Sequence, residues 1–339
     1  MSEARPELVA PHRRGEPGRR PFGRLLERLA ERIAVYAYRV GAWLIGHVPA
    51  PLARGLIRSV LVGSYLLWPA KRGIVNANFA HVLGRPVGDP DVRSRALAAY
   101  RTYARYIVEL MRLPRMTNDE TAALVDTSNL MPLEAWWKTA GRGLILTTAH
   151  IGNLEGVARG IARHGWPIAA LADDTSFPEL FAHLRRQRES WGVSLIPWRN
   201  IRDIYGVLRR HEVLTLLVDW GYRSDGIPVR LFGSWTTLPA GPAALAAKTG
   251  AAIVHIAIRR APDNRRYLVT YSDFIEVASS SPAEIARATQ RIADELEKTI
   301  ADAPDQWYSF KPLWPASETE RTELAARAAA MLAPGAEGA

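Results

Sequence analysis

Hydrophobic positions follow two different periods along this chain, and the change between them falls near residue 143. In residues 24–40 and 90–112 apolar side chains return every three or four positions, which is the period of an α-helix. From residue 143 onward, short apolar runs of strand length alternate with segments of helical period. The predicted strands are residues 144–148, 167–172, 193–197, 213–218, 227–233, 252–258 and 267–277.

Helices are predicted between most of these strands. The segments 154–163, 201–210 and 242–248 have helical spacing, and two further helices start at sequences typical of a capping box. These sequences are Ser176-Phe177-Pro178-Glu179 and Ser281-Pro282-Ala283-Glu284. Alternating strands and helices are typical of βαβ units. We therefore expect an α/β fold whose central sheet is mostly parallel or mixed and is flanked by helices on both faces.

The N-terminal third differs from the rest because it is helical and strongly apolar. Residues 24–40 predict an amphipathic helix, and residues 41–70 are apolar but interrupted by His47, two prolines and two arginines. No run reaches the roughly 18 uninterrupted apolar residues of a membrane-spanning helix. Two helices that lie on a bilayer or dip partly into it fit this pattern, and a buried helical hairpin fits it as well.

These changes divide the chain into four predicted regions. Residues 1–21, rich in Arg, Pro, Gly and Glu, are expected to be a disordered basic tail. Residues 22–115 are predicted to be an amphipathic, apolar helical region that associates with a membrane, and residues 116–315 an α/β core. Residues 316–339, rich in Ala, Glu and Arg, are expected to form a C-terminal solvated tail.

Positive charge is concentrated at the N-terminal end. The chain of 339 residues has a net charge of +10, and residues 1–112 hold 19 Lys or Arg against 8 Asp or Glu. Basic residues mixed with aromatic ones indicate either nucleic acid or an anionic membrane surface as a partner. Here the arginines border long apolar stretches, which favours the membrane and argues against nucleic acid.

The absence of certain residue types and motifs from the sequence excludes several classes of reaction and site. The chain has no cysteine, which excludes disulfides, thiolate metal sites and a cysteine nucleophile. It contains no G-x-S-x-G elbow, no G-x-x-x-x-G-K-[ST] phosphate loop and no H-E-x-x-H zinc motif. We therefore expect no metal site and no cofactor.

A histidine stands where the predicted strand 144–148 changes to the helix 154–163. His150 is followed by Asn153 and Glu155. Along a continuous helix the side chains of His150 and Glu155 would diverge by about 140°, but a strand-to-helix turn can bring them together. Glu155 would then orient one imidazole nitrogen, and the other would accept a proton from an alcohol. Main-chain amides near Asn153 could face a phosphate or a developing oxyanion. A satisfied pair in the core is the alternative.

Three more candidates lie at the ends of predicted strands. Arg199 comes just after the run 193–197, and Arg202 follows three residues later. An arginine at the carboxyl edge of an α/β sheet suits a phosphate or another anion, and an ordinary solvated arginine is the alternative. Asp219 follows the run 213–218. It could support the histidine, or it could fix the loop in a purely structural turn.

Taken in order, these motifs resemble the bacterial lipid A biosynthesis acyltransferase family. This branch of the lysophospholipid acyltransferases includes lauroyl/myristoyl and phosphatidylinositol mannoside acyltransferases. The family's histidine, followed after four residues by Asp or Glu, matches His150 and Glu155. The resemblance holds over residues 25–315. It also rests on residues 72–78, 197–199, Asp219 with 229–233, 239–246 with 249–251, and 304–307.

The resemblance implies O-acyl transfer from acyl-CoA or an acyl carrier protein to a hydroxyl of a glycolipid or lysophospholipid. His150 would deprotonate that hydroxyl, and Glu155 would orient and polarise the imidazole. Arg199, together with Arg202, would steady a phosphate or the oxyanion. A lipid acceptor requires the site to face a bilayer, so we expect a peripheral or monotopic protein at the cytoplasmic face of the cell membrane.

The chain departs from the family pattern at two positions. The family's strand-end Asp is often followed by Gln or Arg, whereas Asp219 is followed by Trp220. Some members carry an acidic residue after the Phe-Gly pair, where this chain has Ser234. Both changes concern the expected acceptor side, so the sequence leaves the acceptor open.

Two other functions compete with acyl transfer. A lipid or thioester hydrolase would use His150 to activate water. A non-catalytic membrane- or nucleic-acid-binding protein would use the basic third alone, and it would leave the segment around His150 without a role.

Overall fold

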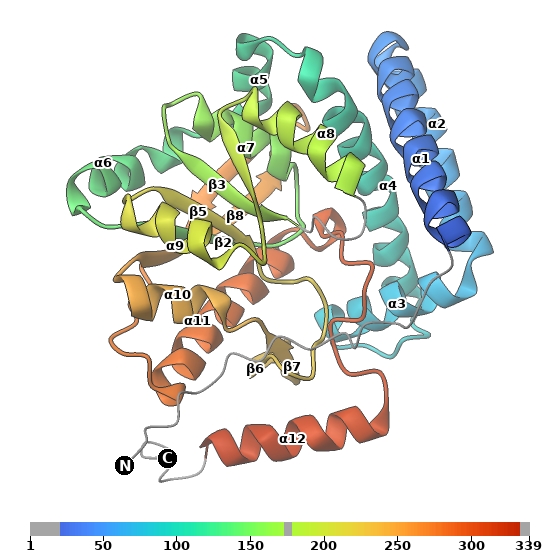
Figure 1. Cartoon of the computed structure of the whole chain (residues 1–339). Helices are drawn as coiled ribbons and strands as arrows, with labels where there is room; N and C mark the ends of the chain where they lie inside the picture. The colour runs from blue at the N-terminus through green and yellow to red at the C-terminus, as the bar shows by residue number, and fades with distance from the viewer. Residues whose placement is uncertain (1–20, 173–177, 333–339) are drawn as a thin grey trace.

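The computed structural model describes residues 21–172 and 178–332, and its centre is a seven-stranded sheet (Figure 1). The strand order is β1-β9-β8-β2-β5-β3-β4. All neighbouring strands are parallel except β8 and β9, which confirms the predicted, mostly parallel sheet. The bounds are β1 (Val125–Asp126), β2 (Leu144–Thr148), β3 (Ile168–Ala172), β4 (Val193–Pro197), β5 (Val213–Leu217), β8 (Ala252–Arg260) and β9 (Tyr267–Tyr271).

The strand β2 lies in the middle of the sheet, between β8 and β5. All five of its residues are buried, as expected for a parallel strand covered by helices on both faces. In register, Thr148 of β2 lies opposite Leu217 of β5. The carboxyl ends of these two strands therefore meet at one edge of the sheet, where the residues that follow them become neighbours.

Helices cover both faces of the sheet (Figure 1). On one face α7 (Leu154–Ala162) and α8 (Pro178–Glu189) pack near β3 and β4. On the other face lie α9 (Ile201–Arg209), α10 (Gly241–Thr249) and α11 (Pro282–Asp302). The Ser281 side chain accepts a hydrogen bond from the Glu284 amide at the start of α11, at the predicted cap. Of the other predicted capping box, Ser176 and Phe177 lie outside the described residues.

The N-terminal helices form a layer beside the core (Figure 1). They are α1 (Pro21–His47), α2 (Ala50–Leu67), α3 (Pro69–Leu83) and α4 (Pro90–Arg112), and α4 lies between the first two and the core. Asp89 caps α4, because its side chain accepts a hydrogen bond from the Asp91 amide at 2.8 Å. The predicted helix 24–40 continues to His47, and the predicted tail 1–21 falls outside the described residues except for Pro21, the first residue of α1.

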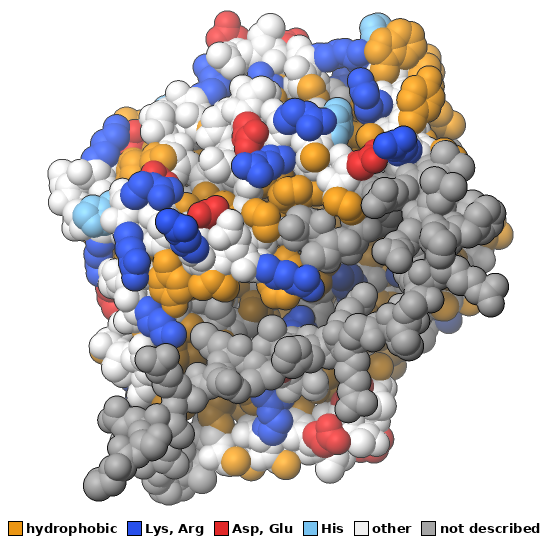
Figure 2. All heavy atoms as spheres, in the orientation of Figure 1, with side chains coloured by type: hydrophobic (Ala, Val, Ile, Leu, Met, Phe, Trp, Pro, Cys, Tyr) orange, Lys and Arg blue, Asp and Glu red, His pale blue; other side chains and the backbone are white. Residues whose placement is uncertain are grey.

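The pair α1 and α2 buries one side and exposes the other. Ala53 and Ile45 pack with Val108 of α4. The two helices therefore pack against the core on this side, as the alternative of a helical hairpin requires. Large apolar side chains are exposed on the same two helices and just after them, and in Figure 2 such side chains gather at the upper right, over α1 and α2. Among the helices that the structure describes, none is long and apolar enough to cross a membrane. The exposed residues are Ile33, Tyr36, Val40, Trp43, Leu44, Val48, Leu52, Leu56, Val60, Leu66, Leu67 and Trp68.

Short elements connect the helical layer to the sheet. Residues 113–140 form η1 (Leu113–Arg115), α5 (Asn118–Leu124), β1, η2 (Ser128–Leu130) and α6 (Met131–Ala140). Thr117 and Glu120 make a reciprocal capping box at the start of α5.

The C-terminal part is less solvated than its composition indicates. The strand β6 (Ile227–Leu231) pairs with β7 (Ser234–Leu238), a strand that the polar sequence did not predict. After η3 (Pro304–Gln306), the helix α12 (Glu318–Leu332) packs against this hairpin. Most residues of α12 are exposed, as in the predicted solvated tail, but Leu324 and Ala328 are each only 1% exposed. The alanine-rich composition of this segment did not reveal the narrow apolar stripe formed by Leu324 and Ala328.

Candidate active site

The turn between β2 and α7 has a backbone that few residues can adopt. Gly152 has φ +63°, in the left-handed region that favours glycine. A Cβ at this position would lie 2.6 Å from Cγ2 of Ile258, so the close approach to β8 also requires glycine. The Gly152 amide donates to the Gln306 carbonyl at 3.1 Å. This amide therefore has a partner within the protein and does not face a substrate.

The turn brings His150 against Asp219, which follows β5. His150 Nδ1 donates to Asp219 Oδ1 at 2.7 Å, and the His150 amide donates to Oδ2 at 2.9 Å. Trp307 Nε1 donates to the same Oδ2 at 2.8 Å. The Asp219 side chain is 0% exposed, whereas that of His150 is 30% exposed. The structure thus places a buried, fully hydrogen-bonded carboxylate behind a partly accessible imidazole.

The two side chains shift each other's protonation in opposite directions. Burial would raise the pKa of Asp219, but the charge and hydrogen bonds of His150 and the Trp307 indole lower it below its usual range. Burial would lower the pKa of His150, but the Asp219 carboxylate outweighs this effect and raises it, with Lys311 acting against it. Because Nδ1 is held by Asp219, Nε2 is the nitrogen left to exchange a proton.

Glu155 does not occupy the position that the sequence analysis gave it. It lies in the first turn of α7 and accepts hydrogen bonds from Arg188 of α8, whose Nε is 2.9 Å from Oε2 and 3.1 Å from Oε1. Both side chains are largely buried. The imidazole partner is Asp219, because the neighbouring strands β2 and β5 end side by side while α7 turns Glu155 toward α8.

The other predicted substrate ligands lie elsewhere. Asn153 is buried; its Oδ1 accepts from the Gly156 amide at 2.9 Å and caps α7, and its Nδ2 donates to Glu109 at 3.1 Å. Arg199 and Arg202 are exposed, and Arg199 stacks over Trp198 with its guanidinium carbon 4.9 Å from the ring centroid. Neither arginine lines a cavity at His150.

Glu109 of α4 connects several elements around the candidate site. Its carboxylate accepts hydrogen bonds from Arg260 (2.6 Å), Tyr267 (2.8 Å), Arg105 (3.0 Å) and Asn153. The Arg260 amide in turn donates to the Gln306 side chain at 2.7 Å. This cluster, which we call the Glu109 cluster, joins the helical layer to β8, to β9 and to the turn that carries His150.

Two cavities meet at His150. The larger, of about 460 Å³, extends between α7, α8 and the sheet, and the smaller, of about 250 Å³, lies toward the segment after Trp307. Tyr106, His150, Leu154 and Trp220 line both. The larger cavity has a mostly apolar wall that includes Leu146, Val157, Ala158, Ile161, Leu180 and Phe181.

The smaller cavity is aromatic and carries a cation. Tyr103, Tyr308 and Phe310 form part of its wall, and Lys311 lies beside them. Burial raises the pKa of Tyr106, which lines both cavities, well above its ordinary value, so its phenol stays protonated. The imidazole therefore stands between an apolar space and an aromatic, cationic one.

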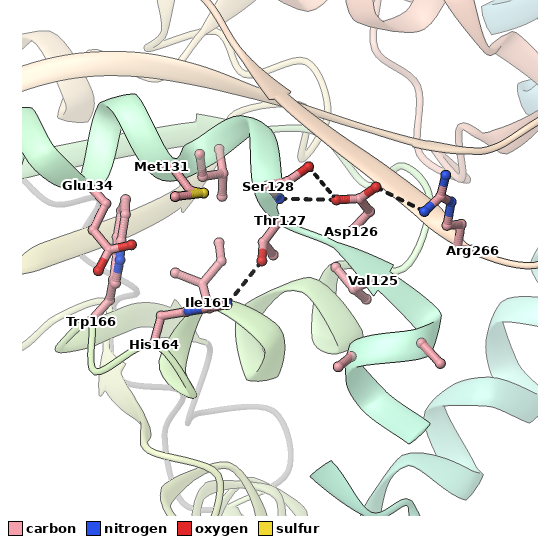
Figure 3. A pocket seen from close by; sticks show the side chains of 13 residues that line it. Val125, Asp126, Thr127, Ser128, Met131, Glu134, Ile161, His164, Trp166 and Arg266 are labelled. Carbon is pink, nitrogen blue, oxygen red and sulfur yellow. Dashed lines mark hydrogen bonds and ion pairs between the residues drawn. The ribbon is translucent and has the colours of Figure 1, made fainter. Parts of the chain in front are cut away.

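A further cavity, of about 530 Å³, lies away from this chemistry (Figure 3). It surrounds His164, just after α7, whereas His150 precedes the start of that helix. Figure 3 shows Asp126 joined to Ser128 and Arg266, and Thr127 joined to His164. The polar groups of this cavity thus bind one another. Among residues 21–172 and 178–332, no group of three or more His, Cys, Asp or Glu side chains could hold a metal ion.

Several residues at the site carried no signal of their own in the sequence. Arg188, Lys311 and Glu109 look like ordinary surface charges on predicted helices and loops. Trp307 belonged to a segment singled out by resemblance, without a stated role. Only their contacts with Glu155, Trp220, Asn153 and Asp219 distinguish them.

Comparison with known proteins identifies the family of the chain. The chain is 28% identical to a phosphatidylinositol mannoside acyltransferase of Mycolicibacterium smegmatis over 309 residues, covering 87% of this chain and 97% of the relative. It is 30% identical to a protein of the same name from Mycobacterium tuberculosis (strain CDC 1551 / Oshkosh) over 264 residues, covering 74% of this chain and 80% of the relative. Residues 22–316 match the family described as bacterial lipid A biosynthesis acyltransferase. The chain therefore belongs to the bacterial lipid A biosynthesis acyltransferase family and is an acyltransferase.

Proposed function

We propose that this chain transfers a fatty acyl group from acyl-CoA or an acyl carrier protein to a hydroxyl of a glycolipid, at the cytoplasmic face of a cell membrane. His150 is the general base, and Asp219 is the carboxylate that orients it. The observation that carries the proposal is the 2.7 Å hydrogen bond between His150 Nδ1 and Asp219 at the junction of two cavities.

In this mechanism one proton moves twice. His150 Nε2 takes the proton of the acceptor hydroxyl while the hydroxyl oxygen forms a bond to the thioester carbonyl carbon. The tetrahedral intermediate then collapses, the C–S bond breaks, and the imidazolium returns the proton to the leaving thiolate. Asp219 stabilises the imidazolium formed between the two steps, as a buried carboxylate does in other catalytic dyads and triads.

The cavity between α7 and α8 supports a lipid donor. An acyl chain is uniformly apolar, and burying it gains about 0.8 kcal/mol per methylene. The wall of the 460 Å³ cavity provides apolar side chains and begins at His150. The ion pair of Glu155 with Arg188 fastens α7 to α8 at this wall, so Glu155 is a residue that maintains the acyl cavity.

The acceptor class follows from the relatives. Both are named phosphatidylinositol mannoside acyltransferases, and we propose an acceptor of that glycolipid class here. The smaller cavity, with its aromatic wall and His150, is the side from which the acceptor hydroxyl approaches.

The exposed apolar side of α1 and α2 supports peripheral binding to a membrane. Side chains such as Trp43, Leu56 and Leu67 are exposed there, and the basic residues of the N-terminal third favour anionic lipids. A lipid acceptor can then reach the site without crossing water.

The test is product analysis with the purified protein and two matched histidine variants. Acyl-CoA is supplied with and without phosphatidylinositol mannoside, and both acylated lipid and free fatty acid are measured. We expect acylated lipid from the wild type and from His164→Ala, whose histidine lines the separate cavity of about 530 Å³. His150→Ala should lose transfer by about 10²- to 10⁴-fold.

Two results would contradict the proposal. Near-full transfer by His150→Ala would remove the general base. Free fatty acid as the sole product, whether or not the acceptor is present, would identify a hydrolase that uses His150 to activate water.

A further inference from the structure

The segment from Trp307 to Trp314, which we call the strap, is fixed by hydrogen bonds along its length. Besides the bond from Trp307 to Asp219, the Tyr308 amide donates to the His150 carbonyl at 2.7 Å. Asn78 of α3 donates to the Lys311 carbonyl at 2.8 Å and accepts from the Leu313 amide at 3.1 Å. The strap therefore holds its side chains in fixed positions relative to His150.

Lys311 is the strap residue that carries positive charge into the site. Its ammonium nitrogen lies 3.5 Å from the centroid of the Trp220 ring, in a cation–π contact. The Trp220 ring centroid is 5.7 Å from that of His150. These two distances keep the ammonium within about 9 Å of the imidazole. Trp220 is 54% exposed, so the Lys311–Trp220 pair borders both solvent and the small cavity.

Charge within this cavity is asymmetric. Of the described residues that line it, Asp219 is buried behind the imidazole and already accepts three hydrogen-bond donors. Lys311 also opposes protonation of His150 by lowering its pKa, as expected for a cation this close to the imidazole. An anion entering beside His150 thus meets the Lys311 cation among aromatic side chains, and no accessible carboxylate of the lining residues.

We propose that Lys311, held over Trp220 by the strap, binds a phosphodiester group of the lipid acceptor and so sets which hydroxyl reaches His150. The inference rests on the proposed acyl transfer and adds the recognised group. A phosphodiester and a sugar hydroxyl one or two rings apart span the distance between Lys311 and His150. The phosphates of an acyl-CoA donor lie at the far end of its long pantetheine arm, so the acceptor is the better source.

The arginines expected to hold a phosphate do not compete for this role. Arg199 and Arg202 are exposed beyond β4, at the sheet edge, and β5 and β3 separate that strand from β2. Lys311 instead meets Trp220, the residue at which this chain departs from the family's usual Gln or Arg after the strand-end carboxylate. Trp220, at which the chain departs from the family pattern, and the Lys311 cation are therefore in direct contact.

The kinetic experiment compares two acceptors in neutral detergent micelles, which removes any effect of membrane surface charge. One is phosphatidylinositol monomannoside, and the other is an uncharged mannosyl diacylglycerol. Lys311→Met should raise KM for the anionic acceptor about tenfold and leave KM for the uncharged acceptor and for acyl-CoA unchanged. Lys311→Arg should restore most of the affinity, and Lys298→Met, a matched change on the exposed face of α11, should alter neither.

A binding measurement separates this inference from the proposed function. Calorimetric titration of His150→Ala protein with the deacylated, water-soluble headgroup of phosphatidylinositol monomannoside requires no turnover. Binding should weaken about tenfold when Lys311→Met is added, even if the wild type transferred no acyl group at all.

Three outcomes would overturn the inference. In the first, the headgroup binds equally with and without Lys311. In the second, Lys311→Met raises KM for acyl-CoA alone, which would assign the cation to the donor phosphates. In the third, both acceptors lose kcat equally, which would make Lys311 a group that acts on the reacting thioester.

Discussion

At the residue scale, the proposed chemistry depends on how the imidazole of His150 is held in place. Asp219 fixes Nδ1 of His150, raises the pKa of the imidazole and is itself kept ionised by the pairing. Glu155, at the motif spacing, neutralises Arg188 instead. In the proposed mechanism the two carboxylates therefore have separable roles: Asp219 in proton transfer, and Glu155 in maintaining the wall of the larger cavity.

The pH dependence of activity distinguishes them. His150 accepts a proton only when it is neutral, and the Asp219 carboxylate raises its pKa above the ordinary value of a histidine. We therefore expect kcat/KM to fall on the acid side, beginning at a higher pH than an unperturbed histidine would give. Asp219→Asn removes the charge that raises this pKa. We expect the acid limb to move to lower pH and kcat to drop by roughly 10²-fold or more.

Glu155→Gln is the matched control for that measurement. It weakens the Arg188 pair and can lower kcat, but it should leave the acid limb where the wild type has it. An acid limb that moves in Glu155→Gln and stays in Asp219→Asn would return Glu155 to the role of orienting acid.

At the element scale, α4 stabilises the catalytic turn through a buried carboxylate. The Glu109 cluster gathers Arg260 of β8, Tyr267 of β9 and Asn153 at the cap of α7 around one side chain. The side chains of Arg260 and Glu109 are 5% and 16% exposed. In such surroundings, removing one member leaves buried charge uncompensated.

Glu109→Ala should therefore lower the free energy of unfolding by about 3–5 kcal/mol. Urea denaturation followed by circular dichroism measures the loss. The control is Glu189→Ala, which removes the partner of Arg185 in an exposed pair and should change stability by less than about 1 kcal/mol. Equal small losses in both variants would mean that the Glu109 cluster contributes no more than a surface pair.

At the scale of the whole molecule, the exposed apolar side of α1 and α2 is placed beside the catalytic core by α4. Burial of a large apolar side chain gains about 1.5–3 kcal/mol, so several such residues together can hold the protein on a bilayer. Positive charge from the same third of the chain adds attraction to anionic lipid.

Introducing charge on this surface should weaken membrane binding. The double change Trp43→Glu and Leu56→Glu, at side chains that are exposed, should reduce affinity for phosphatidylglycerol vesicles at least tenfold in a sedimentation assay. Met131→Glu, at an exposed residue of α6, is the control and should bind as the wild type does. Unchanged binding by the double variant would show that another surface meets the lipid.

The sequence by itself determined most elements of the sheet and the position of the candidate general base. Periodicity predicted the bounds of β2 and β4 as the structure has them, because short, mainly apolar runs between polar turns are typical of strands. It also put His150 at the strand-to-helix turn. It missed β7, whose Thr236 and Thr237 are buried but polar, and the apolar stripe of α12.

Only the tertiary structure decided which groups work with His150. Asp219 lies 69 residues away in sequence, and Trp307 and Lys311 lie farther still, so no local spacing connects them. The strand order, which places β5 beside β2, and the strap, which crosses the ends of both, bring them together. Local sequence patterns indicate secondary-structure propensity and burial. The residue that pairs with a charged side chain depends instead on which strand ends lie side by side in the sheet.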